Sequence, residues 1–295
     1  MDPREYLVSH QRIELNDPVL IAAFQGWNDA GEAATFAATH MAQVWSGDQI
    51  ASIDPEDFYD FQAVRPQVEL DEGLTRKIVW PANEFWAAKT SKRDVILLVG
   101  TEPNTHWRTF CDVVVSVARA NNVRFALTLG ALLADIPHSR PVHITGTAAD
   151  AELVQRLGLQ RSRYEGPTGI VGVLHDAFAR AGIDSASLWA AVPHYLAVSP
   201  NPKAALALVR KATDLVGVPA DVSDLEEATT TYEERVTEMV AADEDVQNYV
   251  RILEERSDER EDSPFENPID PGDMPSGESI AAELENYLRE RTDDE

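Results

Sequence analysis

The stretch Pro18-Val-Leu-Ile-Ala-Ala-Phe-Gln-Gly-Trp-Asn-Asp-Ala-Gly31 decides the fold class of this sequence. It opens with a short apolar run of the length of a β-strand. The run stops at residues 26–31, where Asn28 or Asp29 can cap a helix over residues 32–44. A strand followed directly by a helix is the repeating unit of an α/β fold.

The same alternation recurs along residues 1–218. Further strands are predicted at residues 76–80, 94–99, 124–130, 142–145 and 187–192, and further helices at residues 107–120, 148–157, 169–181 and 203–216. Crossover helices between strands of a largely parallel sheet produce this pattern. We therefore expect one α/β domain over residues 1–218. Residues 51–74 interrupt the alternation and are expected to leave the sheet.

A second pattern begins after residue 218 and predicts an acidic helical region over residues 219–295. Apolar residues recur there every seven positions, at Leu225, Tyr232, Met239, Val246 and Leu253. This spacing predicts one helix over residues 222–257, followed by a linker at 262–277 and a helix at 279–290. The first helix could pair with another subunit or pack on its own α/β domain. The polar residues Thr229 and Asp243 interrupt the seam and favour the second alternative.

The net charge of −26 is carried mainly by this region, since residues 221–295 hold 26 acidic and 6 basic residues. Negative charge repels phosphate groups, so nucleic acid and anionic membranes are poor partners, and a basic protein surface is the better candidate. No apolar run reaches the length of a membrane helix, and residues 1–5 do not resemble a secretory signal. The expected location is the cytoplasm. The single cysteine, Cys111, is expected to be a buried structural residue.

Polar residues at predicted strand ends form the candidate site, because ligands of open α/β sheets bind outside the carboxyl ends of the strands. The candidates are Asn28, Asp29, Glu102, Asn104, His138, Arg140, Tyr164, Glu165 and His194. Each also has a structural interpretation. Asn28 and Asp29 could cap a helix, and Glu102 could hold backbone amides or pair with Arg140. His138 and Arg140 could together bind an anion, while His194 is more typical of a hydrogen-bonded structural histidine.

Complete catalytic, metal and nucleotide motifs are absent from the sequence. The segment 166–172 lacks the lysine of a phosphate-binding loop, and the segment 26–31 lacks a glycine of the dinucleotide fingerprint. Neither a zinc-binding His-Glu-x-x-His or Cys-x-x-Cys pattern nor a Gly-x-Ser-x-Gly elbow occurs. The sequence therefore predicts no catalytic residue, no metal and no cofactor, and favours a protein that is not an enzyme.

Six short motifs, taken in order over residues 5–215, give the chain a family resemblance. They are Gly26-Trp-Asn-Asp-Ala-Gly31, Gly100-Thr-Glu-Pro103 followed by Trp107, His138-Ser-Arg-Pro141, Tyr164-Glu-Gly-Pro-Thr-Gly169, Pro193-His-Tyr195 and Pro200-Asn-Pro202. Together they resemble the actinobacterial branch of the proteasome assembly chaperone 2 family. The resemblance implies a three-layer α/β/α sandwich, similar to purine nucleoside phosphorylases and hydrogenase maturation peptidases.

The resemblance also implies partners. It indicates a homo-oligomer, with a trimer favoured, and proteasome subunits as further partners. Eukaryotic and archaeal relatives bind core-particle subunits through a C-terminal hydrophobic-Tyr-any tripeptide. The final residues here, Asp293-Asp294-Glu295, do not match that tripeptide.

Two functions from different classes follow. The first is a non-enzymatic, protein-binding or chaperone-like protein. The family resemblance and the lack of a complete catalytic motif favour it. The alternative is a small-molecule-binding protein or enzyme of the nucleoside phosphorylase or hydrolase type. In that alternative Glu102 and Asp29 would be acid, base or ribose-binding groups, His138 a proton shuttle, and Arg140 an anion anchor.

Overall fold

The structure is a computed structural model that describes residues 3–71, 75–148, 151–161, 165–196 and 198–259. The described residues all belong to one compact unit, Met1–Arg260. The predicted linker at 262–277 and the predicted helix at 279–290 lie outside the described residues.

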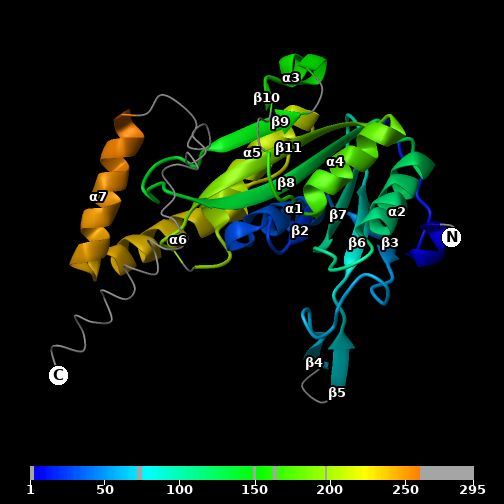
Figure 1. Cartoon of the computed structure of the whole chain (residues 1–295), viewed down its shortest axis with the longest axis horizontal. Helices are drawn as coiled ribbons and strands as arrows, with labels where there is room; N and C mark the ends of the chain where they lie inside the picture. The colour runs from blue at the N-terminus through cyan, green and yellow to red at the C-terminus, as the bar shows by residue number, and fades with distance from the viewer. Residues whose placement is uncertain (1–2, 72–74, 149–150, 162–164, 197, 260–295) are drawn as a thin grey trace. The chain divides into compact units, whose positions relative to one another are not determined.

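A nine-stranded mixed sheet forms the centre of the fold (Figure 1). The strand order is β1 (Leu7–Ser9), β3 (Asp48–Ile53), β6 (Asn83–Ala88), β7 (Val95–Thr101), β2 (Val19–Gln25), β8 (Phe125–Ala134), β11 (Asp184–Pro193), β9 (Ile144–Ala148) and β10 (Gln160–Arg161). The four middle strands β7, β2, β8 and β11 run parallel. The strands β1, β3 and β6 continue the sheet antiparallel on one side, and β9 pairs antiparallel with β11 on the other.

Helices cover both faces of the sheet and make the three layers that were expected. One face packs against α1 (Ala33–Val44) and α5 (Pro202–Val216), and the other against α2 (Trp107–Ala120) and α4 (Ile170–Ala181). Strand β2 shows why both faces need a cover. Its residues Val19, Ile21 and Ala23 belong to one core, while Leu20, Ala22 and Phe24 belong to the other. The apolar run at residues 18–24 is therefore a central strand with no polar face.

Shorter elements complete the domain. These are the 3-10 helices η1 (Pro3–Tyr6) and η2 (Ala30–Glu32) and the helix α3 (Ala151–Leu157). The predicted strands at 94–99, 124–130, 142–145 and 187–192 correspond to β7, β8, β9 and β11. The sequence analysis missed β1, β3, β6 and β10, which extend the edges of the sheet.

The predicted strand at residues 76–80 forms, but it does not join the main sheet. It is β5 (Thr75–Val79), which pairs with β4 (Gln67–Asp71) in a separate two-stranded hairpin. Only part of the segment 51–74 leaves the sheet as expected, because residues 51–53 lie in β3. Val68 faces Ile78 across the hairpin and Leu70 faces Arg76, and polar residues alternate with Val68 and Leu70 in β4. Alternation of this kind fits a two-faced hairpin better than a central strand buried on both sides.

The prediction of a single helix at residues 222–257 is wrong, because the first helix ends at Ala241 and a second begins at Glu244. Two helices occupy the segment, α6 (Ser223–Ala241) and α7 (Glu244–Glu259). The Asp243 carboxylate accepts hydrogen bonds from the backbone amides of Asp245 and Val246, at 2.9 and 3.3 Å. The residue that interrupts the heptad pattern is thus the cap of a new helix.

Helix α6 packs on α5 of its own domain, which agrees with the alternative favoured above. Its buried residues are Leu225, Tyr232, Val236 and Val240. Met239, predicted to lie on the seam, is exposed. A straight helix has 3.6 residues per turn, so toward the end of α6 Val240 lies on the inner face in place of Met239. Among the described residues, no helix combines the length and the hydrophobicity needed to cross a membrane.

Candidate functional site

Two predicted site residues, Asn28 and Glu102, meet at the carboxyl ends of β2 and β7. Glu102 follows β7, and its Oε1 atom accepts hydrogen bonds from Asn28 Nδ2 at 3.2 Å and from the Ile170 backbone amide at 2.7 Å. Ile170 is the first residue of α4, so the carboxylate also meets the positive end of that helix. Glu102 therefore holds one backbone amide and one side-chain amide, which is close to the interpretation that it holds backbone amides. Its predicted pairing with Arg140 is wrong, because Arg140 bonds to α7 instead.

Two glycines of the family motifs make room for this carboxylate. A Cβ atom on Gly169 would lie 2.2 Å from Asn28 Nδ2 and 2.7 Å from Glu102 Oε1. Gly26 has a φ of +140°, and a Cβ atom there would lie 3.2 Å from the Cβ of Glu102. A side chain at either position would push the loops after β2 and before α4 away from Glu102.

Asp29 lies beside this cluster and caps α1, as one interpretation predicted. Its Oδ1 atom accepts hydrogen bonds from the backbone amides of Ala34 at 2.7 Å and Thr35 at 3.3 Å, and its Oδ2 atom accepts one from the Thr35 hydroxyl. Burial is the main cause that raises the pKa of Asp29, while these hydrogen bonds oppose the shift. Asn28 does not cap the helix, since its amide points to Glu102.

A hollow of about 390 Å³ adjoins these strand ends. It is lined by Gln25, Gly26, Asp29, Gly31, Glu32, Leu196, Val198 and Ser199. Of the eight predicted site residues that the structure describes, Asp29 is the one that lines it. The size would admit a small ligand, but the Asp29 carboxylate is already used by the first turn of α1.

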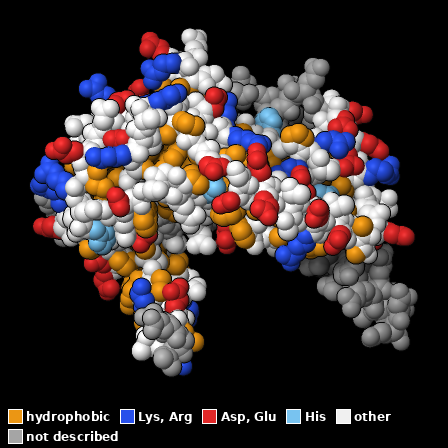
Figure 2. Space-filling model, turned by 180° about the vertical axis from the view of Figure 1, so that it is seen from behind, with side chains coloured by type: hydrophobic (Ala, Val, Ile, Leu, Met, Phe, Trp, Pro, Cys, Tyr) orange, Lys and Arg blue, Asp and Glu red, His pale blue; other side chains and the backbone are white. Residues whose placement is uncertain are grey.

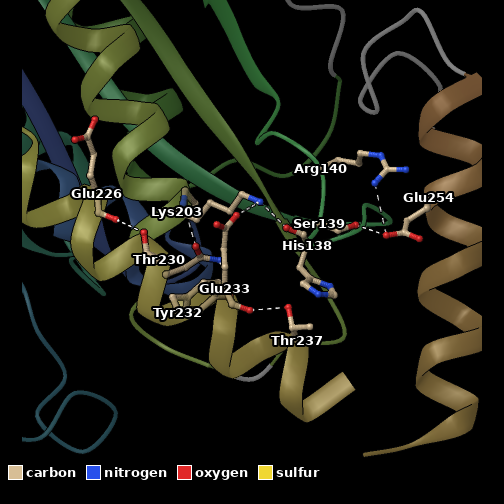
Figure 3. A network of polar contacts seen from close by, with 12 residues as sticks. His138, Ser139, Arg140, Lys203, Glu226, Thr230, Tyr232, Glu233, Thr237 and Glu254 are labelled. Atoms are coloured by element: carbon tan, nitrogen blue, oxygen red, sulfur yellow. Dashed lines mark hydrogen bonds and ion pairs between the residues drawn. The ribbon is translucent and has the colours of Figure 1, made fainter. Parts of the chain in front are cut away.

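His138, Arg140 and His194 form a second group against α6 and α7. His138 and Arg140 can be followed in Figure 3. The Tyr195 hydroxyl lies 2.8 Å from both the backbone nitrogen and the Nδ1 atom of His138. The Lys203 ammonium donates to the His138 carbonyl at 2.5 Å and pairs with Glu233 of α6 at 2.7 Å. Burial, assisted by the charge of Lys203, lowers the pKa of His138.

Arg140 and His194 contact acidic and aromatic groups. Arg140 donates to both carboxylate oxygens of Asp258 in α7, at 2.8 and 2.7 Å. The His194 Nδ1 atom lies 3.1 Å from Asp135, and its Nε2 atom lies 3.4 Å from the Tyr249 hydroxyl. The anion that Arg140 was expected to bind is thus a carboxylate of the same chain.

The two remaining predicted residues that the structure describes, Asn104 and Glu165, do not join either group. Asn104 accepts a hydrogen bond from the Asp60 backbone amide at 3.0 Å. Glu165 is exposed. Tyr164 lies outside the described residues. Within the described part of the chain, no group of three His, Cys, Asp or Glu residues is arranged to hold a metal ion.

The sequence analysis missed one exposed feature, the apolar face of the β4–β5 hairpin. Val68 and Leu70 of β4 are 57% and 64% exposed, and Ile78 of β5 is 48% exposed. The hairpin projects from the sheet, and hydrophobic side chains lie along it (Figure 2). Trp80 anchors its base by an edge-to-face contact with Phe61 at 4.7 Å. The alternation of residues 67–71 was the signal for this face in the sequence.

Comparison with known proteins identifies the fold. The model of the PAC2 family matches residues 23–240, which is most of the chain. The chain belongs to the PAC2 family. This confirms the resemblance stated from the six motifs, several of which supply Asn28, Glu102, Gly169, His138 and Tyr195 to the two groups described above.

Two solved actinobacterial structures are similar over most of this PAC2 chain. A PAC2 family protein from Streptomyces avermitilis is 44% identical with a TM-score of 0.74, and the match covers 79% of this chain and 100% of that one. A Mycobacterium tuberculosis protein described as a proteasome-assembly chaperone homologue is 46% identical with a TM-score of 0.72, and the match covers 79% of this chain and 99% of that one.

A more distant structure shares the fold alone. It is Pyrococcus furiosus PbaB, described as an archaeal proteasome activator, which is 20% identical with a TM-score of 0.64. The match covers 79% of this chain and 97% of PbaB. Among curated proteins, none matches this sequence.

Proposed function

We propose that this protein is a non-enzymatic, chaperone-like protein of the cytoplasm that binds proteasome core-particle subunits. The apolar face of the β4–β5 hairpin is the observation that carries the proposal. An isolated two-stranded hairpin is marginally stable in water, and exposed aliphatic side chains on it gain free energy when a partner protein covers them. The similarity to a mycobacterial proteasome-assembly chaperone homologue supports the choice of partner.

The state of the strand-end residues supports a role without catalysis. The carboxylates of Glu102 and Asp29 are used by backbone amides and neighbouring side chains, and the Arg140 guanidinium is used by Asp258. Groups engaged in this way hold the loops in place. The acidic region after residue 218 adds a surface that would attract a basic patch on the partner. The family resemblance further supports self-association, with a trimer favoured.

The hairpin face provides the first test. Replacing Val68, Leu70 and Ile78 by threonine keeps β-branched residues in both strands but removes most of the apolar surface. We expect binding to purified proteasome core-particle subunits to weaken at least about tenfold, because each buried aliphatic side chain contributes roughly 1.5–3 kcal/mol. Titration calorimetry or anisotropy would measure the affinity, and native gels would follow core-particle assembly.

A matched control lies on the opposite face of the same hairpin. Glu69 and Lys77 face each other across the strands, so replacing both by threonine leaves the net charge unchanged. The affinity of this variant for the core-particle subunits should lie within about twofold of that of the original chain. The free energy of unfolding of both variants should lie within about 0.5 kcal/mol of the original value. If the apolar-face variant bound with the same affinity as the original chain, the hairpin could not be the binding surface. If the original chain bound no core-particle subunit, the proposal that the proteasome is its partner would be wrong.

The hollow of about 390 Å³ favours small-molecule binding as a second candidate function. A thermal-shift screen with nucleosides and phosphate, singly and together, separates the two candidates. A ligand at 100 times its dissociation constant would stabilise the fold by about 2.7 kcal/mol. The leading proposal expects no such shift, and a reproducible shift that Asp29→Asn abolishes would support the second candidate.

A further inference from the structure

Helix α7 lies on a surface that we call the α7 seat. The seat is formed by Ser139 and Arg140 after β8, His194 and Tyr195 after β11, and Val236 and Val240 of α6. Figure 3 shows Ser139 and Arg140 directed toward Glu254 of α7. The contacts of α7 with this surface define the chemistry that the surface can recognise.

The polar half of the seat binds two carboxylates one helical turn apart. Arg140 makes two hydrogen bonds to Asp258, and its NH1 nitrogen lies 3.6 Å from Glu254. The Ser139 hydroxyl also donates to Glu254. A guanidinium that bonds both oxygens of a carboxylate selects its position as well as its charge.

The other half of the seat is apolar and aromatic. The Tyr249 ring of α7 packs edge-on against His194 at 5.6 Å and Tyr195 at 6.0 Å. Val250 is buried in a cluster with Val236 and Val240 of α6. One face of α7 therefore presents tyrosine, aliphatic side chains and two acids to complementary groups.

Several observations separate α7 from the body that it contacts. The helix begins at its own cap, Asp243, after the break that ends α6. The PAC2 family match ends at residue 240, so the seat belongs to the family fold and α7 lies beyond it. Its ion pair between Arg140 and Asp258 is solvent-exposed, and an exposed pair contributes little net stability.

We propose that the α7 seat is a binding site for an acidic amphipathic helix of a partner protein, and that α7 is its internal competitor. The partner helix would carry two carboxylates four residues apart and an aromatic and aliphatic stripe, as α7 does. Displacement of α7 would expose the seat without unfolding the α/β body. The inference concerns a different surface from the hairpin and does not depend on it.

The test opens the seat by charge reversal in the full-length chain. Glu254→Lys with Asp258→Lys places two cations against Arg140 and should release α7. Glu255→Lys with Glu259→Lys is the matched control, because it makes the same change on the exposed side of the same helix. The probe is a fluorescein-labelled peptide with the sequence of residues 243–259, and anisotropy at low salt measures its affinity.

We expect the opened chain to bind this peptide at least about tenfold more tightly than the original chain and the control, because α7 no longer competes. Trypsin should also cut the opened chain faster at Arg251 and Arg256. The variant Arg140→Glu should reject the acidic peptide but bind a peptide carrying lysine at positions 254 and 258. Such a reversal of preference would assign the contact to Arg140.

Three outcomes would overturn the inference. The first is equal peptide binding by the opened chain and the original chain. The second is equal binding of both peptides to Arg140→Glu, which would indicate unspecific attraction. The third is a dimer that dissociates when the seat is opened, because α7 of a second copy would then be the occupant. Light scattering on both chains detects that case.

Discussion

Acidification from neutral pH to about pH 4 should remove about 3 kcal/mol of the free energy of unfolding through His175 alone. His175 lies in α4, and its Nε2 and Nδ1 atoms lie 2.9 Å from Thr128 Oγ1 and 2.7 Å from Ser185 Oγ. A further hydrogen bond of 2.8 Å joins Thr128 to Ser187. Thr128, Ser185 and Ser187 are buried and His175 is half-buried, and together they connect α4 to β8 and β11.

Burial lowers the pKa of His175 from 6.5 to about 4. Between these two values the unfolded chain binds a proton that the folded protein does not. Stability therefore falls as the pH falls, by up to about 1.4 kcal/mol per pH unit. The loss begins near pH 6.5 and is complete only below about pH 4, where the folded and the unfolded chain are both protonated.

Urea denaturation at a series of pH values, on the original chain and on His175→Leu, measures this contribution. The variant should be less stable at neutral pH, because Thr128 and Ser185 lose a partner, but it should lose less stability on acidification. His138, whose pKa is lowered mainly by burial and also by Lys203, titrates in both proteins and cancels in the difference. Identical pH dependence of the two proteins would contradict the assignment.

Replacement of Glu102 by alanine should cost about 3 kcal/mol of stability. The change would leave the Ile170 amide and the Asn28 side chain without their acceptor, and each unsatisfied buried donor costs roughly 1–3 kcal/mol. Ile170 is fully buried and Asn28 is 2% exposed, so water cannot easily replace the carboxylate. The loops after β2 and β7 and the start of α4 should all loosen, which hydrogen exchange can follow.

The conservative variant Glu102→Gln distinguishes a structural role from an acid or base role. Glutamine keeps an oxygen acceptor at the same place, so we expect a loss of about 1 kcal/mol, from the missing charge. Glu165→Ala, at an exposed position, should change stability by less than about 0.5 kcal/mol and serves as the control. If glutamine were as damaging as alanine, the hydrogen bonds to Oε1 could not be the reason for the effect.

Roles that depend on neighbours in the sequence were predictable. Asp29 lies just before the helix that it caps, and a short acid before an apolar helical stretch carries that signal. The kind of partner that Glu102 has, a backbone amide, was one of two predicted alternatives. Which amide it would be was not predicted, because no helix begins directly after Glu102 in the sequence. Its true partner, the amide of Ile170, is 68 residues away in the sequence.

The site itself was predicted as one set and is found as two. Asn28 and Glu102, which both follow strands, are joined by a hydrogen bond, and Asp29 is the next residue after Asn28. His138, Arg140 and His194 also follow strands, but they face α6 and α7, which the sequence did not place there. The motifs identified the family because they hold the loops together, and that purpose does not require one shared pocket.

The sequence by itself determined the α/β class, the central strands and the apolar stripe of α6. Each of these depends on periodicity within ten to twenty residues, and that periodicity fixes which face of an element is buried. The tertiary structure alone decided that residues 75–79 pair outside the main sheet, that Glu102 accepts a hydrogen bond from the Ile170 amide, and that Arg140 binds Asp258 rather than Glu102. These outcomes depend on which distant segments become neighbours. A local pattern indicates that a side chain will be buried or hydrogen-bonded, but the fold of the whole chain determines which residue it contacts.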